Sequence, residues 1–396
     1  MMNKIPKGWE VKKLGEIFNI VTGKTPSKKI REYFNGNIPF VKPSDLDLSD
    51  YIENSEDTLT QDGFKKAPFI PKNSVLISCI GNLGKKAILK QNGSCNQQIN
   101  AILPNSNFDM KFVFYYIDII KPWMKQNASA TTISILNKSR FEQMPFIYPN
   151  LAEQKAIADK LDDSFAKIEN AITNLINAKE NLKLYKQSVL KSAFNGDLLP
   201  NTSPTHWEVK KLGEICEIMD NQRKPINSSE REKRLISAKQ KFPYYGATGQ
   251  VGFIDDYIFD CEAVLLGEDG APFLDFFKDK AYMVSGKFWV NNHAHILKAK
   301  NKISLNAFIC YFLNTLDYSP YVSGTTRLKL NQSSMKNIEI PLPSLSEQNL
   351  IVAEIDRRFA IVDKTLNLID KSIQNAKNLK QSILKKAFSG ELRSDI

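Results

Sequence analysis

The nine residues Trp9–Ile17 read WEVKKLGEI, and the same nine letters return unchanged at Trp207–Ile215. An identity of this length inside one chain indicates an internal duplication. The duplication extends further, because Gln187–Leu198 (QSVLKSAFNGDL) returns as Gln381–Leu392 (QSILKKAFSGEL). These repeats predict two similar halves related by a pseudo-two-fold axis. Such a protein suits a partner with two related sites, and double-stranded DNA is the commonest partner of that kind.

The segments between the repeats differ from each other. Residues 18–130 contain YFNGNIPFVKPSDL, whereas residues 216–322 contain YYGATGQVGF. One short repeat remains between them, since Thr131-Thr132 corresponds to Thr325-Thr326. The chain therefore alternates variable domains with a shared frame. We expect a first variable domain over 1–150, a first frame helix over 151–200, a second variable domain over 201–344 and a second frame helix over 345–396.

The charge of the chain favours a polyanionic partner. Its 396 residues include 54 lysines and arginines against 43 aspartates and glutamates, for a formal net charge of +11. Basic side chains bind nucleic acid by neutralising phosphates and releasing counterions. The excess is local, since residues 1–45 hold nine basic side chains against four acidic ones, and residues 220–241 hold seven against three. Both basic stretches open a variable domain.

The remaining composition narrows the class of protein. The five cysteines and three histidines show no spacing typical of a zinc site, so we expect reduced thiols and no metal. The first residues contain no apolar leader, and no stretch reaches the roughly 20 apolar residues that span a bilayer. We therefore expect a cytoplasmic protein.

A long helix is predicted after each variable domain. Residues 150–194 contain neither proline nor glycine, and apolar side chains recur there at the a and d positions of a heptad. The second copy keeps the register, and Asn195-Gly196 and Ser389-Gly390 suit the ends of the two helices. One helix cannot bury such a stripe alone, so the copies should pair as an antiparallel coiled coil. The expected seam is Leu161, Phe165, Ile168, Ile172, Leu175, Leu182 and Val189 against Ile355, Phe359, Val362, Leu366, Ile369, Ile373 and Ile383.

Each variable domain is predicted to be a mixed α/β (α+β) module. A short helix should open each domain, at 11–18 and 209–218, and strands should follow at 74–78, 86–89, 263–266 and 287–290. An amphipathic helix is expected later, at 111–124 and 305–316. A helix pair of about 44 residues per helix would be about 65 Å long and would hold the two modules at a set distance.

Polar loops of both domains carry the side-chain types that contact DNA. Asn, Gln, Arg and Lys read base edges and Ser, Thr and Lys bind phosphates, although Asn and Gln are also common turn formers. In the first domain the candidates are Lys24, Thr25, Ser27, Lys28, Lys29, Asn82, Lys85, Asn96, Gln97 and Gln98. In the second they are Arg223, Lys224, Tyr244, Tyr245, Thr248, Asn291, Asn292, His293, Thr325, Thr326 and Arg327.

These motifs resemble the target-recognition domains of the specificity subunit of type I restriction-modification enzymes. The first half is similar in TGKTPS, YFNGNIPFVKPSDL, LISCIGNLGKKAIL and CNQQINAI, and the second in YYGATGQVGFIDDYIF, VLLGEDGAPF, GKFWVNNHAHIL and SGTTRLKL. The frame is similar through P-x-L-x-E-Q before each helix and K-x-A-F-x-G-x-L at its end. The resemblance covers essentially the whole chain.

The resemblance implies a DNA-recognition subunit without an active site. Such a subunit recognises a bipartite double-stranded DNA site and positions two adenine-N6 methyltransferase (M) subunits, which restriction/translocase (R) subunits join. The helices would act as the ruler for the gap between half-sites. The chain itself would need no cofactor, while its partners would use S-adenosylmethionine, ATP and Mg²⁺.

Four other interpretations rank lower. Gly23-Lys24-Thr25 suggests a P-loop, but position 18 is Phe where the motif requires Gly. The chain contains no Pro-Pro pair, so the methyltransferase signature N/D-P-P-Y/F/W is missing. His293 and His295 could form a metal pair, although no carboxylate or cysteine pattern accompanies them. A coiled-coil adaptor that binds other proteins would explain the frame but not the two basic variable domains.

Overall fold

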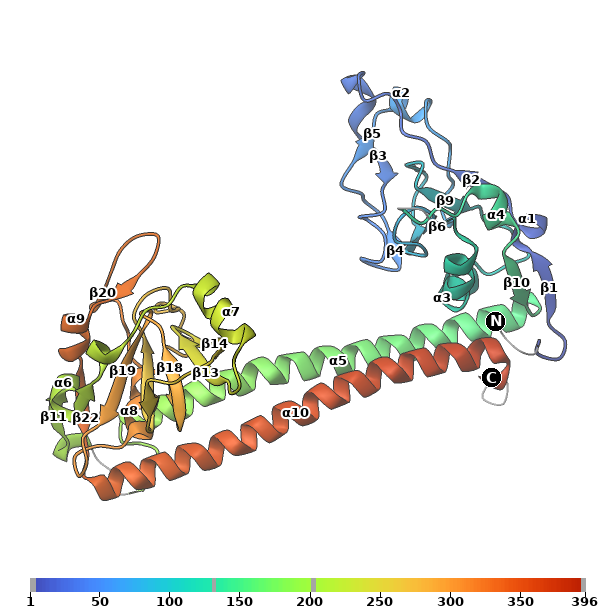
Figure 1. Ribbon diagram of the computed structural model, residues 1–396. Coiled ribbons are helices and arrows are strands. Elements are labelled where there is room, and N and C mark those ends of the chain that lie inside the picture. The colour runs from blue at the N-terminus through green and yellow to red at the C-terminus, as the bar shows by residue number, and fades with distance from the viewer. Residues whose placement is uncertain (1–4, 130–132, 201–203, 393–396) are drawn as a thin grey trace. The chain divides into compact units, whose positions relative to one another are not determined.

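The computed structural model describes residues 5–129, 133–200 and 204–392, so Thr131-Thr132 lies outside the described residues. The chain divides into two compact units. Unit 1 comprises Met1–Thr173 and Ile373–Ile396, and unit 2 comprises Asn174–Ser372. Each unit contains one variable domain and one end of each long helix (Figure 1).

The repeated WEVKKLGEI stretch forms a strand and one turn of helix. In unit 1, β1 (Glu10–Lys13) precedes α1 (Leu14–Ile17), and in unit 2, β11 (Glu208–Lys211) precedes α6 (Leu212–Ile215). The prediction of a helix over 11–18 and 209–218 was therefore right only for the middle turn, since the first residues form β1 or β11, Phe18 lies beyond α1, and Cys216–Ile218 form a strand. β1 and β11 each pair antiparallel with a distant partner, β10 (Pro145–Tyr148) or β22 (Glu339–Leu342). The pairing joins the start of each domain to its end, just before the long helix.

A five-stranded sheet forms the body of the unit 1 domain, in the order β2-β9-β6-β7-β4. The strands are β2 (Ile20–Thr22), β9 (Ile99–Ile102), β6 (Val75–Ser78), β7 (Lys86–Leu89) and β4 (Tyr51–Ile52). One face packs on α3 (Met110–Asn127), and the other buries a separate cluster that includes Leu76 and Leu89. The smaller elements are η1 (Arg31–Tyr33), β3 (Phe34–Val41), β5 (Thr58–Leu59), α2 (Gln61–Phe64), β8 (Ser94–Cys95) and α4 (Lys138–Glu142).

The unit 2 domain has a related main sheet in the order β12-β19-β16-β17. The strands are β12 (Cys216–Ile218), β19 (Ala294–Ala299), β16 (Ala263–Gly267) and β17 (Ala281–Val284), and α8 (Asn306–Leu313) packs on them. A second sheet contains β14 (Gly249–Ile254), β13 (Phe242–Gly246), β18 (Lys287–Val290) and β15 (Phe259–Asp260). The smaller elements are η2 (Pro204–His206), η3 (Asp220–Gln222), α7 (Ser228–Ile236), β20 (Val322–Ser323), β21 (Lys329–Leu330) and α9 (Gln332–Lys336).

The strands predicted at 74–78, 86–89, 263–266 and 287–290 are confirmed as β6, β7, β16 and β18. The amphipathic helices predicted at 111–124 and 305–316 are confirmed as α3 and α8, with different ends. The mixed α/β class predicted for both domains therefore holds.

The two long helices are α5 (Leu151–Phe194) and α10 (Leu345–Ser389). Gly196 and Gly390 follow them with φ of +80° and +78°, the left-handed conformation that ends a helix. Among the described residues no helix is both long enough and apolar enough to span a membrane.

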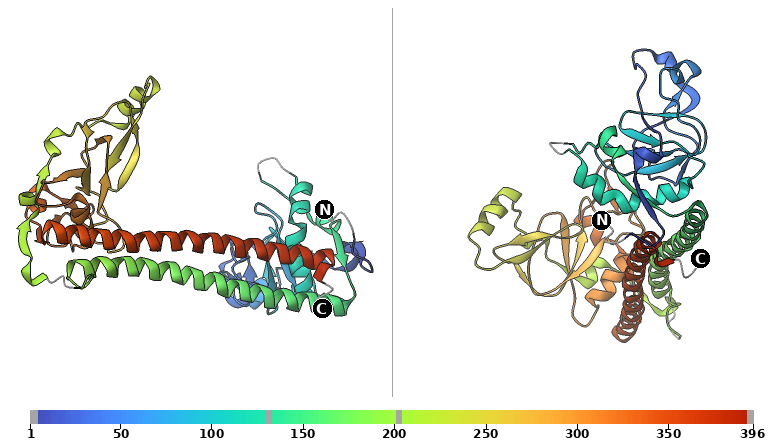
Figure 2. Two further views of the ribbon diagram at one scale, coloured as in Figure 1. Left: turned by 90° about the horizontal axis from the view of Figure 1, so that it is seen from below. Right: turned by 90° about the vertical axis from the view of Figure 1, so that its right-hand side faces the viewer.

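Ion pairs show that the helices run antiparallel. In unit 2, Lys186 Nζ lies 2.6 Å from Asp363 Oδ1, and Lys179 Nζ lies 2.5 Å from Asp370 Oδ1. In unit 1, Lys380 pairs with Glu169. The Lys186–Asp363 and Lys380–Glu169 pairs occupy equivalent positions of the internal repeat, so each unit pairs its two helix segments in the same way. The two helix segments of each unit lie side by side in every view (Figures 1 and 2).

All predicted seam residues are buried or partly buried. At the helix ends, however, the seam belongs to the domain cores. Phe165 packs against Tyr115 of α3, and Phe359 packs against Tyr311 of α8. Phe388, near the end of α10, packs against Phe112 of α3 with ring centroids 4.9 Å apart and the rings tilted by 45°. The helices therefore hold their domains by the same apolar stripe that joins them to each other.

Candidate nucleic-acid interface

Four loops of the unit 1 domain meet at one edge of its main sheet. β2 and β6 end at this edge and β9 and β7 begin there, because neighbouring strands are antiparallel. Backbone hydrogen bonds join the loops: Cys79 N donates to Gln98 O at 2.8 Å, and Leu136 N donates to Cys79 O at 2.8 Å. We call the loops 23–27, 79–85, 96–98 and 133–136 the unit 1 edge.

Three of the predicted DNA-binding residues lie together on the unit 1 edge. A Cβ atom on Gly23 would lie 2.1 Å from Asn96 O, so only glycine lets the first loop pass so closely over the 96–98 loop. Beyond it, Thr25 Oγ1 donates to Gln97 Oε1 at 2.7 Å. Lys24 and Gln97 are exposed on either side of Thr25. The sequence predicted these residues separately, and the structure brings them together.

The other candidates of unit 1 differ in their access to solvent. Four are exposed: Ser27, Lys28, Lys29 and Asn82. Lys85 is half-buried and its Nζ donates to Pro43 O at 3.3 Å. Asn96 is buried, and its side chain bonds both the backbone and the side chain of Gln98. Asn96 therefore shapes the loop from inside, and we leave it out of the proposed contact set.

The main sheet of unit 2 has the same kind of edge. Loops 219–224, 268–271, 291–293 and 324–328, which we call the unit 2 edge, meet there. Glu268 N donates to His293 O at 2.8 Å, and Leu330 N donates to Glu268 O at 2.7 Å. These two bonds repeat those that Cys79 makes in unit 1. Two domains with little sequence in common therefore bring equivalent loops together in the same way.

Two candidates of unit 2 have internal roles. Arg223 Nη1 lies 2.7 Å from Glu268 Oε2 and donates to Ala294 O at 2.9 Å. Tyr244 is 5% exposed and lies beneath the Arg231 guanidinium, 4.7 Å from its carbon to the ring centroid. Both types commonly contact DNA, but here their functional groups face the protein. We therefore leave Arg223 and Tyr244 out of the proposed contact set.

The Asp269 carboxylate bonds side chains from two other loops of the unit 2 edge. Its Oδ1 lies 2.6 Å from His293 Nδ1 and 2.9 Å from Arg327 Nη2, and Asn291 Oδ1 accepts from His293 N at 2.8 Å. Tyr245 is half-buried beside Tyr282. Exposed candidates of unit 2 are Lys224, Thr248, Asn292, Thr325, Thr326 and Arg327.

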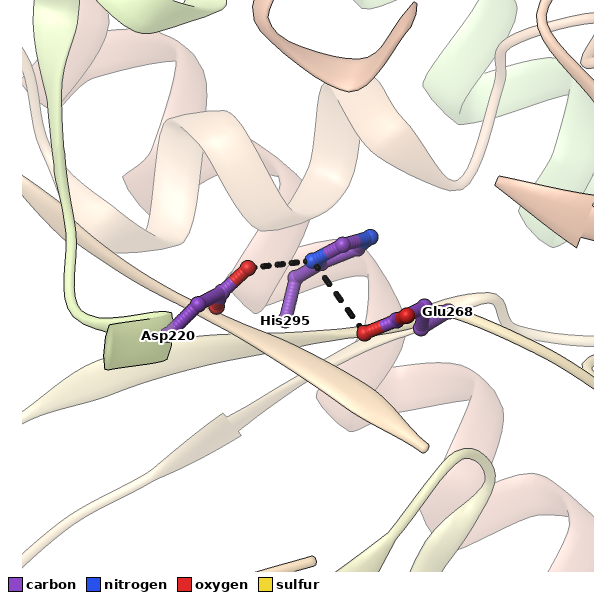
Figure 3. Close-up of side chains that lie close together, drawn as sticks. All are labelled: Asp220, Glu268 and His295. Atoms are coloured by element: carbon purple, nitrogen blue, oxygen red, sulfur yellow. Dashed lines mark hydrogen bonds and ion pairs between the residues drawn. The ribbon is translucent and has the colours of Figure 1, made fainter. Parts of the chain in front are cut away.

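A charged cluster lies beneath the unit 2 edge (Figure 3). Asp220 and Glu268 both point toward His295, whose Nδ1 lies 2.6 Å from Asp220 Oδ2 and 3.8 Å from Glu268 Oε2. Burial would raise the pKa of the Asp220 carboxyl, but the hydrogen bond and charge of His295 outweigh it and lower that pKa below its usual value. His293 bonds Asp269 instead. The two histidines considered as a metal pair therefore bond different carboxylates.

The sequence argument missed α7, which is capped by Asn227. Arg234 of α7 lies 5.1 Å from the ring centroid of Trp289 and its Nε lies 2.7 Å from Asp255 Oδ1. The basic run at 220–241 was visible in the sequence, and the Asn-Ser-Ser cap before Glu230 was the signal for a helix.

Comparison with known families decides the class of the chain. The family model described as the type I restriction modification DNA specificity domain matches residues 6–178 and again residues 204–376. The two matches together cover most of the chain, one in each half. The chain belongs to this family of type I specificity subunits.

Two curated relatives match this chain over nearly its whole length, and a third matches less than half of it. The MjaIX specificity subunit of Methanocaldococcus jannaschii is 26% identical over 429 residues, covering 99% of this chain and 95% of the relative. The EcoprrI specificity subunit of Escherichia coli is 23% identical and covers 90% of this chain and 89% of the relative. A putative specificity subunit of Haemophilus influenzae is 35% identical over 41% of this chain and 39% of the relative.

Solved structures share the fold of this specificity subunit. A chain from a study of complex assembly and conformational transition in the type I R-M system has a TM-score of 0.78 at 20% identity, covering 98% of this chain and all of that one. The HsdS subunit of Thermoanaerobacter tengcongensis has a TM-score of 0.62 at 19% identity and covers 99% of each chain.

A specificity subunit is a DNA-recognition component rather than a catalyst, and the two matched domains are its target-recognition domains. The P-loop interpretation also fails on the structure. Gly23-Lys24-Thr25 lies in an irregular loop. Residues 26–30, which the structure describes, form no helix after it.

Proposed function

We propose that the unit 1 and unit 2 edges each read one half-site of a bipartite DNA sequence. The observation that carries this proposal is the shared edge: equivalent loops meet through equivalent backbone bonds of Cys79 and Glu268, yet expose different side chains. A shared scaffold with different loops suits two readers of different half-sites. Base edges would be read by amide and guanidinium groups, and phosphates would be held by lysine and hydroxyl groups.

The proposed contact set follows from exposure. In unit 1 it is Lys24, Thr25, Ser27, Lys28, Lys29, Asn82, Lys85, Gln97 and Gln98. In unit 2 it is Lys224, Tyr245, Thr248, Asn291, Asn292, His293, Thr325, Thr326 and Arg327. We propose the same domain limits as above, with recognition domains over 1–150 and 201–344 and spacer helices over 151–200 and 345–396.

We further propose that two M subunits dock on the frame, followed by R subunits, in the cytoplasm. Large apolar side chains outside the seam support a partner on the helices: Leu184 is 52% exposed, Leu368 56% and Leu379 52%. S-adenosylmethionine, ATP and Mg²⁺ would be used by these partners. The chain's own role would be to position them.

The test maps methylated adenines in cells that express this chain with its methyltransferase, either unaltered or as N292A/T326A. The unaltered chain should direct methylation to two short defined sequences separated by a set gap. The unit 2 variant should relax one half of the motif and leave the other unchanged. Equal relaxation of both halves would contradict one reader per unit, and an assembled complex with no chain-dependent motif would favour the protein-binding adaptor.

A further inference from the structure

The charged cluster of unit 2 has a neutral counterpart in unit 1. Asn100 of β9 lies opposite Ile77 of β6, and His295 of β19 lies opposite Leu266 of β16. Cys79 follows Ile77 by two residues, and Glu268 follows Leu266 by two. The strand register therefore places Asn100 with Cys79 where His295 stands with Glu268.

The third member of each set comes from the first strand of the sheet. Thr22 pairs with Asn100 across β2 and β9. In unit 2, the register that pairs Ile218 with Leu297 brings Asp220, two residues further on, beside His295. Thr22-Asn100-Cys79 and Asp220-His295-Glu268 are therefore equivalent triads, each beneath the four loops of its edge.

The unit 1 triad is held by neutral hydrogen bonds. Thr22 Oγ1 donates to Asn100 Oδ1 at 2.7 Å, and Asn100 Nδ2 lies 3.3 Å from Cys79 Sγ. Asn100 is 2% exposed and Cys79 is 3% exposed. Burial raises the pKa of the Cys79 thiol to about 12, so the thiol stays protonated and the whole triad is uncharged near neutral pH.

The unit 2 triad is ionic. His295 is 1% exposed, and its ring lies between two acceptors, with Nδ1 2.6 Å from Asp220 Oδ2 and Nε2 2.8 Å from Leu330 O. A neutral imidazole offers only one N–H, whereas a protonated ring donates from both nitrogens. Because a carboxylate oxygen and a carbonyl oxygen face the two ring nitrogens, the geometry suits a ring that donates from both.

Further bonds connect the ionic triad to the 219–224 loop and to the strands and the helix next to the unit 2 edge. Glu268 Oε2 lies 2.7 Å from Arg223 Nη1, and Glu268 Oε1 lies 3.1 Å from Lys329 Nζ. Asp220 also accepts from Ile296 N at 2.9 Å and from Gln332 Nε2 at 3.1 Å. Arg223 lies in the 219–224 loop, His295 lies in β19 just after the 291–293 loop, and Lys329 adjoins the 324–328 loop. The network thus holds the loops from beneath.

The same charges argue against a metal ion at this position. The ligand atoms of Asp220, Glu268 and His295 lie within 4.8 Å of one another. Glu268 already faces Arg223 and Lys329, and a ring that donates to both Asp220 and Leu330 O has no lone pair to give a metal. The equivalent unit 1 triad occupies the same position in its sheet and is held by neutral groups. A positioning role therefore fits both units.

We propose that this triad is the positioning site of each recognition edge, and that exchanging Thr-Asn-Cys for Asp-His-Glu at it helps two domains of one fold present different loops to different half-sites. The inference rests on the proposed function for its DNA readout. It assigns half-site specificity to side chains that lie beneath the loops and do not touch DNA. Asp220, His295 and Glu268 are thus positioning residues of unit 2 alone.

The first test compares E268Q with E217Q in the full chain. Glu268→Gln keeps the size of the side chain but removes the charge that Arg223 and Lys329 face, whereas Glu217 is an exposed carboxylate of β12 in the same sheet. Preference for the correct over a scrambled half-site of unit 2 should fall on the order of tenfold in E268Q. Preference for the unit 1 half-site should not change, and E217Q should match the unaltered chain. Equal loss at both half-sites, or no loss at either, would overturn the proposal.

A reciprocal variant acts in unit 1. Cys79→Ala removes the thiol that Asn100 faces, so C79A should weaken discrimination at the unit 1 half-site only. If C79A and E268Q both fail to change any half-site while still folding, the triads are not positioning sites.

The second test needs no DNA, so it separates failure of this inference from failure of the proposed function. Amide hydrogen exchange of the unaltered chain and E268Q should show faster exchange at 291–293 and 324–330 in the variant, with unchanged exchange at 79–81 and 96–98. Unchanged exchange throughout would contradict the network even if DNA recognition is confirmed.

A spectroscopic signature completes the test. The chain contains only three histidines. ¹⁵N-histidine NMR can therefore assign the His295 ring signals as those that disappear in H295N. The proposal expects both ring nitrogens of His295 to bear hydrogen at neutral pH and to remain unchanged when Zn²⁺ is added. A ring with one bare nitrogen, or one that shifts on binding Zn²⁺, would overturn the assignment.

Discussion

Lys86 places a cation inside the unit 1 domain. Its side chain is 5% exposed, with Nζ 2.7 Å from Asp118 Oδ2, 2.6 Å from Phe114 O and 3.7 Å from the Phe114 ring centroid. Burial lowers the pKa of Lys86 from 10.5 to about 8, although Asp118 opposes this shift. The residue therefore connects β7 to α3 at a desolvation cost that its partners offset only in part.

The lowered pKa of Lys86 predicts a pH effect on stability. Between about pH 8 and 10.5 the unfolded chain keeps a proton on Lys86 that the folded chain has released, so the free energy of unfolding should rise with pH in this window. Lys86→Met should remove this rise, which is on the order of 2–3 kcal/mol. Denaturant unfolding of both chains across the window measures it, and parallel pH profiles would contradict the prediction.

Exposed lysines at the unit 1 edge (Lys24) and directly after its first loop (Lys28) should contribute to DNA binding without selecting the sequence. K24A/K28A should weaken binding to random duplex and lower the slope of log K against log salt by about 0.9 for each phosphate that is no longer neutralised. K72A/K90A is the matched control, because both lysines are exposed at the opposite end of β6 and β7. Equal slopes for the two variants would show that the edge does not face DNA.

At the scale of elements, the ends of the long helices contribute both to a domain core and to the pairing of the two helices. Phe165 packs at 5.4 Å from Tyr115 and lies under Lys380 Nζ, 4.6 Å from the ring centroid. Phe359 repeats the arrangement with Tyr311 and with Lys186 Nζ at 4.7 Å. Each phenylalanine thus joins a domain to both helices of its own unit, which makes domain attachment and helix pairing interdependent.

Phe165→Ser should destabilise unit 1 by about 3–5 kcal/mol, because a large buried side chain is replaced by a small polar one. Phe359→Ser should destabilise unit 2 by less, because Phe359 is only partly buried. Hydrogen exchange should increase only in the unit that carries the change. Leu368→Ser is the control, since this α10 side chain is 56% exposed. Exchange and unfolding like those of the unaltered chain would show that the phenylalanines do not hold the seam.

An element could be predicted where the residues that determine it lie close together in the sequence. Apolar runs such as Val75–Ser78 and the heptads of α5 and α10 carry their own periodicity, so strands and seam were predictable. WEVKKLGEI has apolar side chains at helical spacing, but its first half pairs with a strand more than a hundred residues away. The sequence alone contains no sign of that partner.

The candidate site was predictable as a set of loops rather than as a set of contacts. Arg223 and Asn96 have the chemistry of DNA-binding residues, and nothing in their neighbourhood in the sequence distinguishes them from Lys24. Their partners decide the matter, and Glu268 lies 45 residues from Arg223 in the sequence. A pairing over that distance is visible only in the folded chain.

At the scale of the whole molecule, the internal repeat accounts for both the frame and the readers. The ion pairs follow one register: from Lys186–Asp363 to Lys179–Asp370 the α5 number falls by seven as the α10 number rises by seven. From there to Glu169–Lys380 both change by ten. This register identifies which heptads of α5 and α10 face each other and can therefore be removed together.

Deleting 172–178 from α5 and 371–377 from α10 should shorten the frame by one heptad and leave all three ion pairs in register. Seven residues correspond to about 10 Å of helix. At about 3.4 Å for each base pair, the gap between half-sites should shrink by about three base pairs.

The measurement that tests the account most directly is sequencing of DNA selected by the assembled complex, with the unaltered chain and with the paired deletion. We predict a bipartite motif for the unaltered chain, and for the deletion the same two half-sequences with a gap shorter by about three base pairs. An unchanged gap, altered half-sequences, or no motif from an assembled complex would contradict two readers held apart by a helical frame.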